Sequence, residues 1–144
     1  MQRAETISLL KEIYQNATTA TEAMQILSVR AQNSHLTGAL TAQSTTFREI
    51  AQAAADALCE QHILPPAATG WARINLFTDL FFRTALDKTP AHIARILIDA
   101  GTAGAVSITQ HLRTDSDAAP AVRKLAHRLL DAEQHCIVSM QIFL

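Results

Sequence analysis

Glycine, proline, cysteine and aromatic residues are all scarce in this sequence. Its 144 residues include four glycines, four prolines and two cysteines, and aromatic residues make up 5%. Two cysteines are too few for a disulfide scaffold, and Cys59 and Cys136 lack the short spacing of a metal or redox motif. We therefore expect both to be small buried apolar side chains in a reducing cytoplasm.

The sequence also lacks an excess of either charge. Twelve Lys and Arg residues against 13 Asp and Glu residues give a net charge of -1. Nucleic-acid and anionic-membrane binders need clustered cations, so neither partner is expected. The first residues are polar and show no signal peptide. The most apolar stretch, residues 96–108, falls short of the roughly 20 residues that span a bilayer. We expect a soluble, cytoplasmic protein.

Helix-forming residues fill the chain between its few breaks, and alternating β-branched runs are absent. Apolar residues recur at helical spacing, which predicts an all-α fold. Ser34, Thr69 and Thr89 are expected N-caps, and Pro90 follows Thr89 at the first helical position. The five predicted helices cover residues 6–31, 34–61, 69–86, 90–113 and 119–143.

The second predicted helix has the narrowest apolar stripe. It consists of Leu36, Leu40, Gln43, Phe47, Ala51, Ala54 and Leu58. Four long amphipathic helices of similar length bury such stripes best as a four-helix bundle. The shorter third helix would return along the bundle, which gives a ferritin-like topology with a helical crossover. An up-down bundle with an appended helix is the alternative. No repeat or linker divides residues 1–144, so we expect one domain.

The fourth predicted helix carries a face of small residues. Its members are Ala100, Ala103, Gly104 and Ser107, with Gly101 beside them. Glycine inside a helix costs about 1 kcal/mol relative to alanine. We therefore expect Gly101 and Gly104 to allow the close approach of a neighbouring helix. A hinge or a ligand-sized gap is the alternative.

Three segments carry a resemblance to a known group of proteins. They are residues 10–17 (LKEIYQNA), residues 89–94 (TPAHIA) with the two downstream glycines, and residues 132–134 (AEQ). These segments resemble a family of small uncharacterised bacterial proteins that are similar to ferritin-like bundles. The resemblance implies the bundle fold and brings no activity, cofactor or catalytic residue with it.

A di-iron centre is the chemistry that a ferritin-like fold first suggests. Such centres need a core-facing Glu from each of two helices and a Glu-x-x-His motif from each of the other two. The sequence contains no Glu-x-x-His motif. Helical geometry places Glu12, Glu22 and Glu49 away from the apolar stripes and Asp99 at the border of one. We therefore expect no di-iron site.

Glu133 is the one carboxylate that helical geometry directs inward, about 40° from Leu129. A buried carboxylate is costly without partners, so we expect it to form a hydrogen bond with Tyr14 or Gln43. The alternative is a single metal ligand or a buried acid with a raised pKa.

A second candidate site lies on the last predicted helix. His127, Asp131 and His135 are spaced i, i+4 and i+8, so they align and could hold a divalent metal ion. They lie opposite Leu129, however, and are expected to form an exposed polar face. His92, in the first turn of its helix, is expected to have a helix-boundary role.

The third predicted helix is apolar almost all round, which favours burial or a contact with another chain. We expect Leu76 and Phe82 to point outward and form a homodimer contact, with packing of this helix on both sides as the alternative. The favoured function is a non-enzymatic structural or interaction module that forms a homo-oligomer and holds no cofactor. The alternatives are a divalent-metal-binding or oxidase protein with non-standard ligands, and a carrier of a small apolar ligand beside Gly104.

Overall fold

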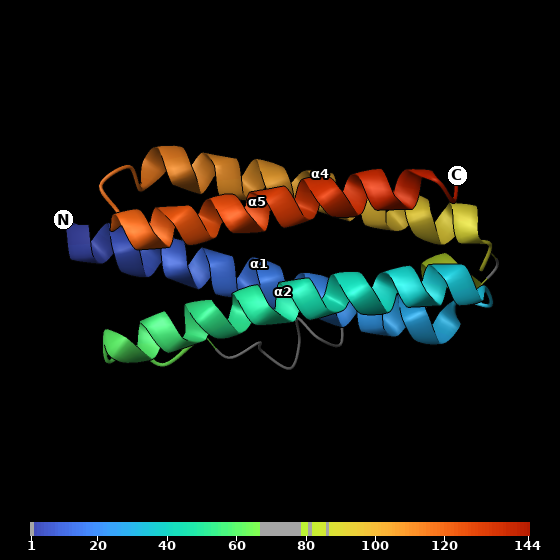
Figure 1. The fold of residues 1–144 in the computed structure, drawn as a ribbon, viewed down its shortest axis with the longest axis horizontal. Helices are drawn as coiled ribbons and strands as arrows, with labels where there is room; N and C mark the ends of the chain where they lie inside the picture. Colours follow the sequence, from blue (N-terminus) through green and yellow to red (C-terminus); the bar gives the residue numbers. More distant parts are fainter. Residues whose placement is uncertain (1, 67–78, 81, 86) are drawn as a thin grey trace.

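The computed structural model describes residues 2–66, 79–80, 82–85 and 87–144. Four long helices account for most of them (Figure 1). Residues 79–80 and 82–85 are also helical, and the described ranges contain no β-strand. The predicted all-α fold is therefore confirmed for these ranges. The long helices are α1 (Gln2–Arg30), α2 (Ser34–Glu60), α4 (Pro90–Thr114) and α5 (Pro120–Gln141).

Their ends lie within four residues of the predicted ones. Most of the predicted third helix, including its expected cap Thr69, lies outside the described residues. Nowhere in the described ranges does a helix combine the length and the apolar character needed to cross a membrane.

The helices form two antiparallel hairpins, α1 with α2 and α4 with α5. Helices α1 and α5 run in one direction along the molecule, and α2 and α4 run in the other (Figure 1). The chain between Glu60 and Pro90 therefore connects opposite ends of the bundle. Helices α1 and α5 each contact both α2 and α4, so the four helices surround a common core.

The predicted apolar stripe of α2 is buried in full. All seven of its residues are buried, and Leu40, Phe47 and Leu58 have no exposed surface. Burying a side chain of this size contributes about 1.5–3 kcal/mol. Large apolar side chains at helical spacing thus hold α2 against α1 and α5. We call these seven residues the α2 stripe.

Two local predictions about α2 are wrong. Its N-cap is Asn33 rather than Ser34, since the Asn33 side chain accepts a hydrogen bond from the Leu36 backbone N–H at 3.0 Å. Cys59 is exposed rather than buried, because it lies about 100° around the helix from Leu58 of the α2 stripe. Cys136, on α5, is buried as predicted.

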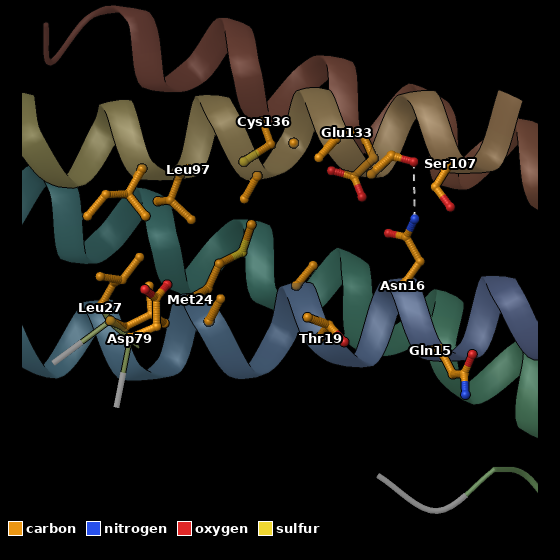
Figure 2. Close-up of a pocket in the computed structure, with 18 of the residues that line it drawn as sticks. Gln15, Asn16, Thr19, Met24, Leu27, Asp79, Leu97, Ser107, Glu133 and Cys136 are labelled. Carbon is orange, nitrogen blue, oxygen red and sulfur yellow. Dashed lines mark hydrogen bonds between the residues drawn. The ribbon is translucent and has the colours of Figure 1, made fainter. Parts of the chain in front are cut away.

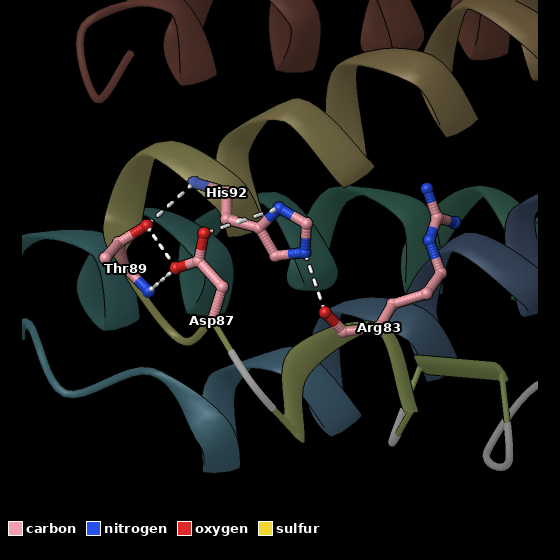
Figure 3. Close-up of polar contacts among 4 residues, drawn as sticks. All are labelled: Arg83, Asp87, Thr89 and His92. Carbon is pink, nitrogen blue, oxygen red and sulfur yellow. Dashed lines mark hydrogen bonds and ion pairs between the residues drawn. The ribbon is translucent and has the colours of Figure 1, made fainter.

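A polar cluster fixes the start of α4 (Figure 3). Thr89 Oγ1 accepts from the His92 backbone N–H at 3.3 Å and donates to Asp87 Oδ1 at 2.6 Å. His92 Nε2 donates to the Arg83 carbonyl at 2.7 Å. Hydrogen bonds from the side chain and backbone of Thr89, helped by His92, lower the pKa of Asp87. The predicted Thr89 cap and the helix-boundary role of His92 are confirmed, and this cluster ties Arg83 to α4.

Candidate functional site

A cavity of about 510 Å³ lies between α1 and α4, with α5 contributing to its wall (Figure 2). Its size falls in the range of roughly 300–1,000 Å³ that is typical of small-molecule sites. Asp79 lies at the end where Leu27 and Leu97 are found (Figure 2). The apolar part of the wall includes Ala20, Ala23, Met24, Leu27, Ile96 and Leu97.

The other end of the cavity is polar, and Glu133 of α5 is its central group. The residue is only 3% exposed, and its carboxylate points toward α1 (Figure 2). No hydrogen bond or ion pair joins it to any residue that the structure describes. Burial raises the pKa of Glu133 from 4.5 to about 8. Its side chain is therefore mostly protonated at neutral pH.

The inward position of Glu133 was predicted correctly, but its partners were not. Gln43 Nε2 donates instead to Ser139 Oγ at 3.2 Å. Tyr14 is half-buried and forms no hydrogen bond with Glu133. The alternative of a buried acid with a raised pKa is the one that the structure bears out.

Two glycines of α4 make room for the Glu133 side chain and its helix. A Cβ atom on Gly104 would lie 2.6 Å from Glu133 Oε1, which is closer than real Cβ contacts. A Cβ atom on Gly101 would lie 3.1 Å from Ile137 Cγ1. The predicted close approach of a neighbouring helix is thus confirmed, and α5 is that helix. Both glycines also line the cavity, as the alternative of a ligand-sized gap required.

Asn16 of α1 faces Glu133 across the cavity (Figure 2). Its Nδ2 atom donates to the Gly104 carbonyl at 3.1 Å. A carbonyl oxygen only accepts, so this bond fixes the orientation of the amide. The Asn16 Oδ1 atom lies 3.2 Å from the position of a Cβ on Gly104, on the same side as the carboxylate. The Asn16 amide oxygen of α1 and the Glu133 carboxyl group of α5 therefore converge beside Gly104.

Glu12 of α1 belongs to the same polar end and was missed by sequence reasoning. Its side chain is 19% exposed, and Oε1 accepts from Ser107 Oγ at 2.6 Å. Its Oε2 atom lies 3.9 Å from His111 Nε2. The prediction assumed one apolar stripe on α1 and therefore placed Glu12 outside the core. In the structure, α4 packs against the side of α1 that carries Glu12. Ser107 and His111 are spaced i, i+4 on α4, so both side chains can face the same residue of another helix. This spacing was the sequence signal that could have predicted their contact with Glu12.

Cys136 of α5 also lines the cavity. Burial, helped by the nearby Glu133 carboxyl group, raises its thiol pKa to about 12. The reactive form of cysteine is the thiolate. At neutral pH the Cys136 thiol therefore stays protonated and acts as an apolar wall group.

The remaining predicted site residues lie elsewhere. His127, Asp131 and His135 are exposed on α5, as expected for a polar face. Within the part of the chain that the structure describes, no three His, Cys, Asp or Glu side chains lie close enough to hold a metal ion. Phe82 is 71% exposed, while Leu76 lies outside the described residues. The homodimer contact through these two residues stays a prediction.

No protein-family model, curated protein or solved structure matches this chain. The resemblance to a bacterial family therefore stays a prediction.

Proposed function

We propose that this chain is a non-enzymatic helical bundle that binds one small, largely apolar molecule in the cavity between α1 and α4. The observation that carries the proposal is the cavity of about 510 Å³ with the buried carboxyl group of Glu133 at its polar end, where no described residue bonds to it. The cavity opens partly to the surface, so a small molecule can enter it from solvent.

The chemistry of the wall supports the same proposal. A mostly apolar pocket with a few converging polar groups is the usual form of a small-molecule site. Burying a carboxyl group without a hydrogen bond costs free energy, and strongly shifted pKa values cluster at functional sites. Glu133, Asn16 and Glu12 provide the converging polar groups, and Met24 and Leu97 belong to the apolar wall.

The finer fold assignment is part of this proposal. The parallel directions of α2 and α4 support a ferritin-like topology, since an up-down order would make the second and third long helices antiparallel. Among the described lining residues, the carboxylates are Glu12, Asp79 and Glu133, and no histidine accompanies them. This donor set does not match the four Glu and two His ligands of a di-iron bundle. We propose a bundle of this group that binds a ligand in place of iron.

A homo-oligomer is a separate part of the proposal. The exposed Phe82 ring supports it, because large exposed apolar side chains commonly mark contacts between proteins. Light scattering, which measures molecular mass in solution, tests it. The wild-type mass is expected to be that of a dimer, and the Phe82→Ser mass that of a monomer. A monomeric wild-type protein would disprove the homo-oligomer and leave the proposed ligand site unaffected.

The ligand site is tested with 1-octanol as a neutral probe, by isothermal titration calorimetry. One molecule is expected to bind per chain, and affinity should rise roughly fourfold for each methylene added from 1-hexanol to 1-octanol. Ala20→Leu places a larger side chain in the wall and should abolish binding. Ala53→Leu, on α2 and outside the cavity wall, is the matched control and should bind as wild type does. Equal affinity in both variants would disprove the proposed site.

A further inference from the structure

We propose that the molecule bound in this cavity carries a protonated amine, and that its ammonium group binds between Glu133 and Asn16. The inference rests on the proposed function and names the chemical class of its ligand. It assigns the apolar wall near Met24 and Leu97 to the tail of the molecule and the polar end to its head group.

Hydrogen-bonding capacity at the polar end favours a donor-rich ligand. One Asn16 amide hydrogen is directed to the Gly104 carbonyl, and the Ser107 hydroxyl donates to Glu12. The Asn16 Oδ1 atom remains as an acceptor, and the Glu133 carboxyl group offers two acceptor oxygens once it is ionised. An ammonium group has three donors and no acceptor, so it matches the site in which Glu133 is ionised. A ligand carboxylate or phosphate would face the Asn16 Oδ1 atom and would be repelled by an ionised Glu133.

The charges around Glu133 favour the same ligand class. Helix α1 contributes Glu12, and α4 contributes His111 on the far side of Glu12, at 3.9 Å. Asp79 and Arg83 also line the wall, where they pair with each other at 3.6 Å. The arginine charge is therefore balanced locally. Glu133 is mostly uncharged in the free protein at neutral pH, so Glu12 is the acidic group that favours a cation at the polar end. Glu133 adds its own negative charge once an ammonium group lies beside it.

Binding of an ammonium group should also move a proton. In the free protein, burial keeps Glu133 protonated at pH 7, since its pKa is about 8. An adjacent cation stabilises the ionised carboxylate, so the carboxyl proton is released to solvent as the amine binds. Affinity for the amine should rise about tenfold per pH unit from pH 6 and level off above about pH 8. An alkylamine stays protonated over this range because its pKa lies near 10.4.

The test compares octylamine with 1-octanol, which have the same tail and different head groups. In calorimetric titrations at pH 8, wild type is expected to bind octylamine at least tenfold more tightly than 1-octanol. Glu133→Gln keeps the side-chain shape and removes the charge. It should weaken octylamine binding at least tenfold and leave 1-octanol binding within twofold. Glu49→Gln, an exposed carboxylate on α2, is the matched control and should bind both probes as wild type does.

Three outcomes distinguish the inference from the proposed function beneath it. Equal affinities of octylamine and 1-octanol for wild type would overturn the amine assignment and leave the proposed function standing. Tighter binding of octanoate than of octylamine would also overturn the assignment, because protonated Glu133 would then act as a donor. If neither 1-octanol nor octylamine binds, the proposed function itself is wrong. The pH dependence of octylamine binding gives an independent reading, since it should be absent in Glu133→Gln.

Discussion

The α2 stripe and the α1–α4 cavity lie in the same bundle, yet they are packed in opposite ways. Leu40, Phe47 and Leu58 of the α2 stripe are fully buried against neighbouring helices. On the other side, α1 and α4 leave a space of about 510 Å³ between them. One side of the molecule is filled with large apolar side chains, whereas small and polar side chains make up much of the wall on the other side.

The difference arises from side-chain volume along α4. This helix presents Ala100, Ala103 and Gly104 to the cavity, whereas α2 presents leucine and phenylalanine to the core. Small residues bring α4 close to α5, as the contacts of Gly104 with Glu133 require, but they cannot also fill the space toward α1. The comparison indicates that the α2 side supplies stability, whereas the α1–α4 side holds the proposed binding site.

The same truncation, leucine to alanine, on each side of the bundle should give the largest difference in stability between the two sides. Leu40→Ala, in the α2 stripe, should cost about 3–5 kcal/mol, because it opens a new void inside a filled core. Leu97→Ala, in the cavity wall, should cost about 2 kcal/mol, because one side of Leu97 already lacks packing partners. Urea unfolding of both variants measures the difference. Equal losses would mean that the cavity wall is packed as tightly as the α2 stripe.

The second prediction concerns how the polar end of the cavity affects stability. The folded-state pKa of Glu133 is raised from 4.5 to about 8, so the folded protein keeps a proton that the unfolded chain releases. Stability should therefore fall as pH rises from about 5 to about 8, by roughly 1.4 kcal/mol per pH unit at most. Glu133→Gln should remove this dependence and be the more stable protein at pH 8. Urea unfolding at pH 5, 6.5 and 8 measures it. Parallel pH profiles for wild type and variant would contradict the shift.

Sequence periodicity predicted the filled side of the molecule well. Every member of the α2 stripe is buried, and the Thr89–Pro90 start of α4 was placed correctly. These features depend on local physics: large apolar residues at helical spacing, and a cap followed by proline. The wrong assignments, Ser34 as the cap and Cys59 as buried, each lie one position from the correct residue.

The cavity could be foreseen only in part. The small residues of α4 suggested a gap as an alternative, and Glu133 was placed inward correctly. Glu12 and Asn16 were not recognised, because a single stripe per helix cannot show that α1 buries a second side against α4. Hydrogen bonds between helices, such as the one from Ser107 to Glu12, depend on tertiary packing that periodicity does not specify.

The same substitution, glycine to alanine, can be compared on the two sides of the bundle. A Cβ on Gly38 of α2 would meet nothing within 4 Å, so Gly38→Ala should stabilise the protein by about 0.5–1 kcal/mol through helix propensity. The same change at Gly104 would press on Glu133, at a cost of about 1–3 kcal/mol that offsets this gain. Thermal unfolding should place Gly104→Ala below Gly38→Ala. In a Glu133→Ala background the penalty at Gly104 should vanish, and a penalty that persists there would mean that another contact causes it.

The smallest expected effect concerns the charged pair that joins the filled side of the bundle across its surface. Glu49 of α2 lies 3.5 Å from Arg128 of α5, and both side chains are more than half exposed. Exposed pairs contribute about 0–1 kcal/mol, so Glu49→Gln should change the free energy of unfolding by less than about 0.5 kcal/mol. The change should disappear in 1 M salt, where screening is strong. A loss above 1 kcal/mol that survives in salt would mean that charge, as well as the α2 stripe, holds α2 to α5. The small expected effect is therefore informative, because it separates the two forces that could explain why this side of the bundle is filled.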